Sequence, residues 1–120
     1  MNKEALQLAG LTKEQAAVYE ALVAGGAMKV SQIGRKTTIN RGLIYYVLGQ
    51  LLEIGLVEKD ETGKVVAFRA VHPLKVKELA DKNEERARDA KIALDGILPR
   101  LISQFNLVSG MPGVRFFEGI

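Results

Sequence analysis

Closely spaced helix-starting and helix-ending signals divide the first half of the chain into short segments. Thr12 opens a capping box, and the glycine pair at 25–26 ends the helix that begins there. A shorter helix is predicted over residues 30–37, and Asn40 is a good N-cap for a third helix over residues 41–54. Because isolated helices of this length are marginal in water, the three helices must bury their apolar faces against one another.

Beyond the third helix the residue types change. Residues 56–59 and 64–70 are β-like, with a β-branched and aromatic bias at Val65, Val66, Phe68 and Val71. Residues 60–63 between them have the composition of a turn, so we predict a two-stranded hairpin. Three helices followed by a hairpin is the order of a winged helix-turn-helix domain. In such a domain the third helix lies in the major groove of DNA, the helix before it braces it, and the hairpin touches neighbouring phosphates.

A long polar helix is predicted over residues 74–104. Small and apolar residues recur in it at alternating spacings of three and four, which is the pattern of a coiled coil, and an Asn at position 83 could set the register of a dimer. Pro99 predicts a kink or break near residues 95–98. The alternative is that the helix lies on its own domain or on another partner, with Asn83 exposed. The predicted dimer contacts are Val76, Ala80, Asn83, Ala87, Ala90, Leu94, Ile97, Leu101 and Phe105.

The predicted fold class is therefore mainly α with a small β-hairpin, a winged helix-turn-helix followed by a coiled-coil-like dimerisation helix. We divide the chain into a DNA-binding domain over residues 1–72, a dimerisation helix over 73–108, and a loop with a short strand over 109–120. A lone strand at 114–117 is not stable by itself, so it must add to another sheet, be mobile, or be the start of a further domain.

The composition excludes several kinds of functional site. The 120 residues include no cysteine and one histidine, His72. Disulfides, thiolate metal sites, His-pair zinc sites and Ser-His-Asp triads are therefore excluded, and His72 is predicted to be structural. No apolar run is long enough to span a membrane and no secretion signal is present, so we expect a cytoplasmic protein. We expect no enzyme activity and no cofactor.

Positive charge gathers where a winged helix-turn-helix meets DNA. The net charge is +3, but between residues 28 and 69 basic residues outnumber acidic ones seven to four. Arg41 could read guanine or clamp a phosphate. Lys59 and Lys64 flank the hairpin turn, whereas Asp60 and Glu61 near its tip would repel phosphates. The hairpin is therefore predicted to contact the DNA backbone rather than insert deeply.

Three stretches resemble one family: "LTKEQAAVYEALV", "SQIGRKTTINRGLIYYVLGQLLEIGLVEK" and "VHPLKVKEL" are similar to the winged-helix domain of TrmB-type transcription regulators. The ending "PGVRFFEGI" is similar to the junction into the effector domain of that family. The resemblance implies a dimer, and it places Arg41, Gly42, Leu43, Tyr45 and Tyr46 at recognition-helix positions. The family tends to have small hydroxyl residues after the arginine, and Gly42 and Leu43 offer no side-chain donor, so base readout should be thinner here.

We predict a sequence-specific or semi-specific regulator that binds double-stranded DNA as a homodimer, with helix 41–54 in the major groove. No effector domain fits after Ile120, so we expect no small-molecule effector for this chain, which is either a truncated form or a free-standing small regulator. Tyr45 is expected to be half-buried with its hydroxyl near phosphate, and Tyr46 to face the groove. The predicted DNA contacts are Lys29, Ser31, Gln32, Arg35, Lys36, Asn40, Arg41, Gly42, Leu43, Tyr45, Tyr46, Gln50, Lys59 and Lys64.

Two other readings stay open at this point. The first is a winged-helix module that binds proteins and not DNA, which the weakly polar Gly42, Leu43 and Gly49 favour. The second is an enzyme or an accessory domain of an enzyme, which the sequence disfavours because it contains no carboxylate pair, phosphate loop or nucleophile constellation. The two tyrosines also have a plainer interpretation, in which one fills the core and the other lies in an interface.

Overall fold

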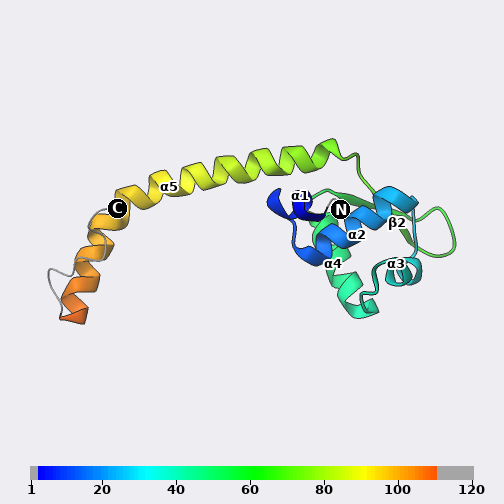
Figure 1. The fold of residues 1–120 in the computed structure, drawn as a ribbon, viewed down its shortest axis with the longest axis horizontal. Coiled ribbons are helices and arrows are strands. Elements are labelled where there is room, and N and C mark those ends of the chain that lie inside the picture. Colours follow the sequence, from blue (N-terminus) through cyan, green and yellow to red (C-terminus); the bar gives the residue numbers. More distant parts are fainter. Residues whose placement is uncertain (1–2, 111–120) are drawn as a thin grey trace. The chain divides into compact units, whose positions relative to one another are not determined.

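The computed structural model describes residues 3–110, and these form five helices and one hairpin (Figure 1). The chain divides into two compact units, the first ending at Asn83 and the second beginning at Glu84. The predicted fold class is confirmed: the first unit is mainly helical with a small antiparallel hairpin, and a long helix follows. In order, the elements are α1 (Lys3–Leu8), α2 (Lys13–Gly25), α3 (Val30–Thr37), α4 (Arg41–Glu53), β1 (Val57–Asp60), β2 (Ala67–Ala70) and α5 (Leu74–Ser109).

The predicted helix caps are present. The hydroxyl oxygen of Thr12 accepts from the backbone N–H of Gln15 at 3.1 Å, and the Gln15 side-chain oxygen accepts from the Thr12 N–H at 2.9 Å, which completes the capping box. Gly26 ends α2 with a φ of 79°, a conformation that glycine adopts without a Cβ clash. These local signals therefore set the length of α2.

The turn between α3 and α4 is held by backbone and side-chain bonds. Thr38 takes the left-handed conformation at a φ of 59°, and its N–H donates to the Gly34 carbonyl at 2.9 Å. Two residues later the Asn40 side chain accepts from the Leu43 N–H at 2.9 Å and caps α4. The turn fixes the direction in which α4 leaves α3.

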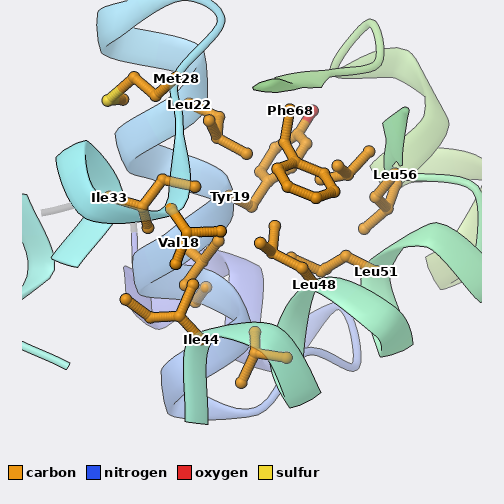
Figure 2. Packing of buried hydrophobic residues seen from close by; sticks show 14 of the residues in the cluster. Val18, Tyr19, Leu22, Met28, Ile33, Ile44, Leu48, Leu51, Leu56 and Phe68 are labelled. Atoms are coloured by element: carbon orange, nitrogen blue, oxygen red, sulfur yellow. The ribbon is translucent and has the colours of Figure 1, made fainter. Parts of the chain in front are cut away.

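The core lies between α2, α3, α4 and the hairpin. Figure 2 shows Phe68 of the hairpin pointing in toward Tyr19 of α2 and Leu48 of α4. Its backbone also forms a β-bridge with Met28, through two hydrogen bonds of 2.8 and 2.9 Å. The largest side chains that are completely buried are Val18, Leu22, Ile33, Ile44, Val47, Leu48, Leu51 and Leu56.

The second hairpin strand is shorter than predicted. It begins at Ala67, whereas the sequence analysis placed its start at Lys64. The register pairs Val57 with Ala70 and Asp60 with Ala67, so the residues between β1 and β2 form a loop. Burial of Phe68 fixes this register, because a slip by one residue would turn that ring out of the core.

The first turns of α5 belong to the first unit, which therefore extends past the predicted boundary at residue 72. The His72 Nδ1 atom accepts from the Leu74 N–H at 3.1 Å at the helix start. Val76 and Leu79 pack against the core, and the Asn83 amide donates to the Ala9 carbonyl at 3.0 Å. Of the two interpretations of Asn83, the structure therefore shows an intramolecular contact, in which the side chain is partly buried and not exposed.

Of the predicted kink or break near Pro99, the break is absent, because α5 is continuous through the proline. The helix ends at Ser109, so the predicted end at 104 is too early. The ribbon of α5 bends where its colour passes from yellow to orange (Figure 1). The predicted strand at 114–117 lies outside the described residues. None of the helices within residues 3–110 is long and apolar enough to cross a membrane.

Candidate nucleic-acid interface

The outer face of α4 is narrow and weakly polar. Ile44, Val47, Leu48 and Leu51 are buried, so the 3.6-residue period places Gly42, Tyr46, Gly49 and Glu53 on the opposite side of the helix. Of these four, Tyr46 carries the largest side chain and is 65% exposed. The outer face can therefore offer a tyrosine hydroxyl, and two glycines let another surface come close to the backbone.

Arg41 and Tyr45 form a pair one turn apart at the edge of α4. The guanidinium Nη2 donates to the Tyr45 hydroxyl at 3.2 Å, and its central carbon lies 5.5 Å from the ring centre. This geometry is a cation–π contact, which holds the guanidinium in one orientation. Tyr45 is 51% exposed, which agrees with the predicted half-burial, and neither Tyr45 nor Tyr46 fills the core.

A groove of about 620 Å³ lies between the start of α3, the side of α4 and the hairpin. We call it the wing groove. Lys29, Arg41, Lys59 and Lys64 all line it, although they come from four separate positions in the sequence. Ser31 and Tyr45 add hydroxyl groups. The fold thus brings six of the predicted DNA contacts onto one surface.

The two faces of the hairpin differ in charge. On β1, Lys59 pairs with Phe68 and lines the wing groove, whereas Glu58 pairs with Arg69 across the strands. Arg69 Nε lies 2.9 Å from Glu58 Oε1, and its Nη1 lies 3.5 Å from Asp60 Oδ2. Arg69 is therefore engaged with two carboxylates, and these acids do not line the groove.

Asp60 is also held by its own turn. Its carboxylate accepts from the Thr62 hydroxyl at 2.6 Å and from the Thr62 N–H at 3.1 Å, and these bonds, helped by nearby Arg69, keep the pKa of Asp60 below its ordinary value. One of the two charges expected to repel phosphates, that of Asp60, is thus bonded within the hairpin.

Removing the charge of Asp60 should give a small, pH-dependent loss of stability. A carboxylate whose pKa is lowered by folding stabilises the native state above the pKa of the unfolded chain, and this contribution disappears as the pH falls through the lowered pKa. Asp60→Asn should therefore lower the Tm slightly at neutral pH and have no effect in strong acid. Thermal unfolding from pH 7 to pH 2 measures the difference, with Glu61→Gln as the neighbouring control. A Tm difference that persists unchanged in strong acid would contradict the assignment.

Several predicted DNA contacts have other roles within the domain. The Gln32 side chain accepts from the Lys29 N–H at 2.9 Å, and the side chain of Asn40 caps α4. The Gln50 oxygen accepts from the buried Gln15 amide at 3.0 Å, which ties α4 to α2. Lys36 lines a different groove, beside α2. The remaining predicted contacts, Arg35, Gly42, Leu43 and Tyr46, are exposed and lie outside the wing groove.

The sequence analysis missed the apolar residues of the wing groove. Val65 and Val66 were assigned to a strand, but they lie in the loop before β2 and line the groove together with Leu52. Two adjacent valines beside Lys64 in a polar turn were the only sequence signal. Among residues 3–110 no three His, Asp or Glu side chains are placed to hold a metal ion.

Six of the nine predicted dimer contacts fall into two groups; of the other three, Ala80 is partly buried, and Ala87 and Ala90 are exposed. Val76 and Asn83 are engaged within the first unit, as described above. In the second unit, Leu94, Ile97, Leu101 and Phe105 are all between 39% and 57% exposed, which is unusual for such large apolar side chains. The helical period places these four on one side of α5, within a stripe about 100° wide.

The arrangement of α2, α3, α4 and the hairpin is that of the winged helix-turn-helix domain of transcription regulators. The family described as "Sugar-specific transcriptional regulator TrmB" matches residues 6–74, and the chain belongs to this family. The resemblance stated from the sequence is thereby confirmed. A search of curated protein sequences found no match.

Solved structures share the fold at low sequence identity. The structure of TrmBL2, described as an archaeal chromatin protein with a novel mode of DNA binding, aligns with a TM-score of 0.66 and 22% identity over 100% of this chain. The chain spans 47% of the length of that protein. A MarR family protein from Bacillus stearothermophilus gives a TM-score of 0.55 and 20% identity over 92% of this chain and 81% of its own. An ArsR-like regulator from Rhodococcus sp. RHA1 gives 0.54 and 19%, over 80% and 89%.

Proposed function

We propose that the protein is a cytoplasmic transcription regulator that binds double-stranded DNA as a homodimer, with α4 in the major groove. The wing groove carries this proposal. Four cations from separate parts of the sequence meet there, at the edge of the helix that has the recognition position in this fold. Such a distributed set of cations suits phosphates, which follow one another along a DNA strand.

The side chains of the wing groove and of α4 suit two kinds of DNA contact, those to phosphates and those to base edges. Lys29, Lys59 and Lys64 suit phosphate contacts, because a flexible ammonium carries charge without fixed geometry. Arg41 presents a planar donor group that its partner Tyr45 holds in place, so it can bond a phosphate or a guanine edge. Tyr46 is the large side chain on the outer face of α4. Because glycines occupy much of that face, affinity should depend more on phosphates than on base contacts.

The apolar stripe of α5 supports the homodimer. Between Leu94 and Ser109 only Asp95 and Arg100 are charged, and the stripe exposes large aliphatic side chains along its length. Pairing with the same stripe of a second copy would remove this surface from water. A dimer would present two copies of α4 to one duplex, with half-sites about one helical turn apart or a multiple of it.

Fluorescence anisotropy of a labelled mixed-sequence duplex tests the proposal. The logarithm of the affinity should fall linearly with the logarithm of salt concentration, by about 0.9 for each neutralised phosphate. Lys59→Ala/Lys64→Ala should reduce this slope by about two. Lys77→Ala/Lys82→Ala, which removes two lysines of α5 outside the wing groove, is the charge-matched control. Absence of binding at low salt would overturn the proposal.

Arg41→Ala should weaken DNA binding about five- to a hundredfold, because the guanidinium makes either a charged phosphate contact or a bidentate base contact worth about 1–3 kcal/mol. The same anisotropy titration measures the loss, and Arg86→Ala, at an exposed position of α5, is the control. An equal loss on every duplex would identify a phosphate contact, and a loss restricted to a selected site would identify base reading. Unchanged affinity would contradict any DNA role for Arg41.

The weak polarity of Gly42, Leu43 and Gly49 favours a second candidate, a winged-helix module that binds a protein surface. The salt series separates the two candidates. A protein-binding module would show no salt-dependent affinity for DNA. Lys59→Ala/Lys64→Ala would then leave the anisotropy signal unchanged.

A further inference from the structure

We propose that the wing groove is a binding site for a small amphipathic anion, a molecule that combines an apolar ring or chain with one acidic group. The regulatory consequence rests on the proposed function, because a ligand in this groove would occupy cations that the DNA needs. The binding site itself does not depend on DNA binding.

Charge complementarity selects an anion. Lys29, Arg41, Lys59 and Lys64 surround the groove, and among residues 3–110 no carboxylate lines it. Two acids of the hairpin, Glu58 and Asp60, are paired with Arg69. A bound acidic group would therefore meet cations without repulsion from the groove wall.

The apolar residues that line the wing groove favour a ligand with an apolar part. Leu48 and Phe68 form part of the lining and belong to the buried core, and Leu52, Val65 and Val66 extend the apolar surface toward solvent. A phosphate backbone makes no use of such an apolar lining, because phosphates and sugars are polar. A concave apolar surface with a few polar groups at its edge is the usual form of a small-molecule site, and about 620 Å³ lies within the usual size range of such sites.

No small-molecule effector was expected for this chain, whereas the wing groove offers a site for one within the winged-helix domain. A ligand in the wing groove would place its acidic group between Arg41 and the hairpin lysines. It would thereby compete directly with a phosphate for the same cations.

Binding of anilinonaphthalene sulfonate, a fluorescent amphipathic anion, tests the site on the whole chain without DNA. Gly49 lines the groove, and a Cβ added there meets no atom within 4 Å, so Gly49→Leu can begin without a clash and its side chain occupies space at the groove wall. Leucine also favours the helix more than glycine does. Gly96→Leu is the matched control, since Gly96 also lies in a helix and its added Cβ meets nothing within 4 Å. Thermal unfolding of each variant checks that it is folded.

The expected result is saturable binding by the parent and by Gly96→Leu, with affinity reduced about tenfold or more in Gly49→Leu. Lys59→Ala/Lys64→Ala should weaken binding as well. Phenylnaphthylamine, which lacks the sulfonate, and inorganic sulfate, which lacks the apolar body, should each bind far more weakly. Equal binding by the parent and Gly49→Leu would overturn the site, because the dye would then lie elsewhere, such as on the apolar stripe of α5. Sulfate binding as tightly as the dye would overturn the amphipathic assignment.

A competition titration then separates this inference from the proposed function. Added dye should release labelled duplex from the parent. Dye binding without any DNA binding would leave the site standing and remove the proposed function. DNA binding without dye binding would overturn the anion site and leave the proposed function standing.

Discussion

Leu101→Asp is expected to convert a dimer into a monomer and to weaken binding to a duplex with two half-sites by about 10²- to 10⁴-fold. Leu101 is 44% exposed and lies in the middle of the apolar stripe of α5, between Ile97 and Phe105. A second copy of the chain would bury this leucine, and an aspartate at the same place would bring two unpaired carboxylates into an apolar seam. The loss of affinity follows because a monomer cannot engage both half-sites at once.

Analytical ultracentrifugation at micromolar concentration measures the first effect, and anisotropy with one-site and two-site duplexes measures the second. Ser103→Asp is the control, because the helical period places position 103 on the side of α5 opposite Leu101. It introduces the same charge and should leave both the dimer and the affinity unchanged. A parent protein that is strictly monomeric at this concentration would contradict the homodimer, and with it the role of the stripe.

Leu51→Ala should destabilise the first unit by about 2–5 kcal/mol, which is enough to threaten folding of a small domain. Leu51 is completely buried in the last turn of α4, and its truncation leaves a cavity in the core beside Leu56, which precedes the hairpin (Figure 2). Each kcal/mol should lower the Tm by about 4–8 °C for a unit of this size.

Urea unfolding followed by circular dichroism measures this loss of free energy of unfolding. Leu43→Ala is a matched control on the same helix, since Leu43 is 37% exposed and its truncation should cost less than about 1 kcal/mol. Equal losses for the two variants would show that the apolar face of α4 is not the one buried here.

The predicted DNA contacts show which inferences needed the fold. Lys59 and Lys64 were identified as hairpin cations from sequence, and the fold places both in the wing groove beside Arg41. Gln50 was assigned to the same interface because it follows the helical period. The structure shows it bonded to Gln15, a partner that is 35 residues away in the sequence. A polar side chain at the edge of a helix face can serve either purpose, and the sequence does not show which.

Local signals in the sequence determined where the helices begin and end. Thr12, Gly26 and Asn40 act through hydrogen bonds and backbone angles within a few residues, so their effect can be read without knowing the rest of the chain. The buried face of α4 is also a local feature, because Ile44, Val47, Leu48 and Leu51 follow the helical period. These features depend on contacts between residues that are close in the sequence, and such contacts can be inferred from the sequence alone.

Only the tertiary structure decided the features that join distant parts of the chain. The hairpin register followed from burial of Phe68, and Asn83 found its partner in the Ala9 carbonyl. The wing groove exists because α3, α4 and the hairpin pack around one core, which brings Lys29 close to Lys64. Each of these features joins residues that are far apart in the chain. Their contacts depend on how whole elements pack, and the residue types alone leave several packings equally favourable.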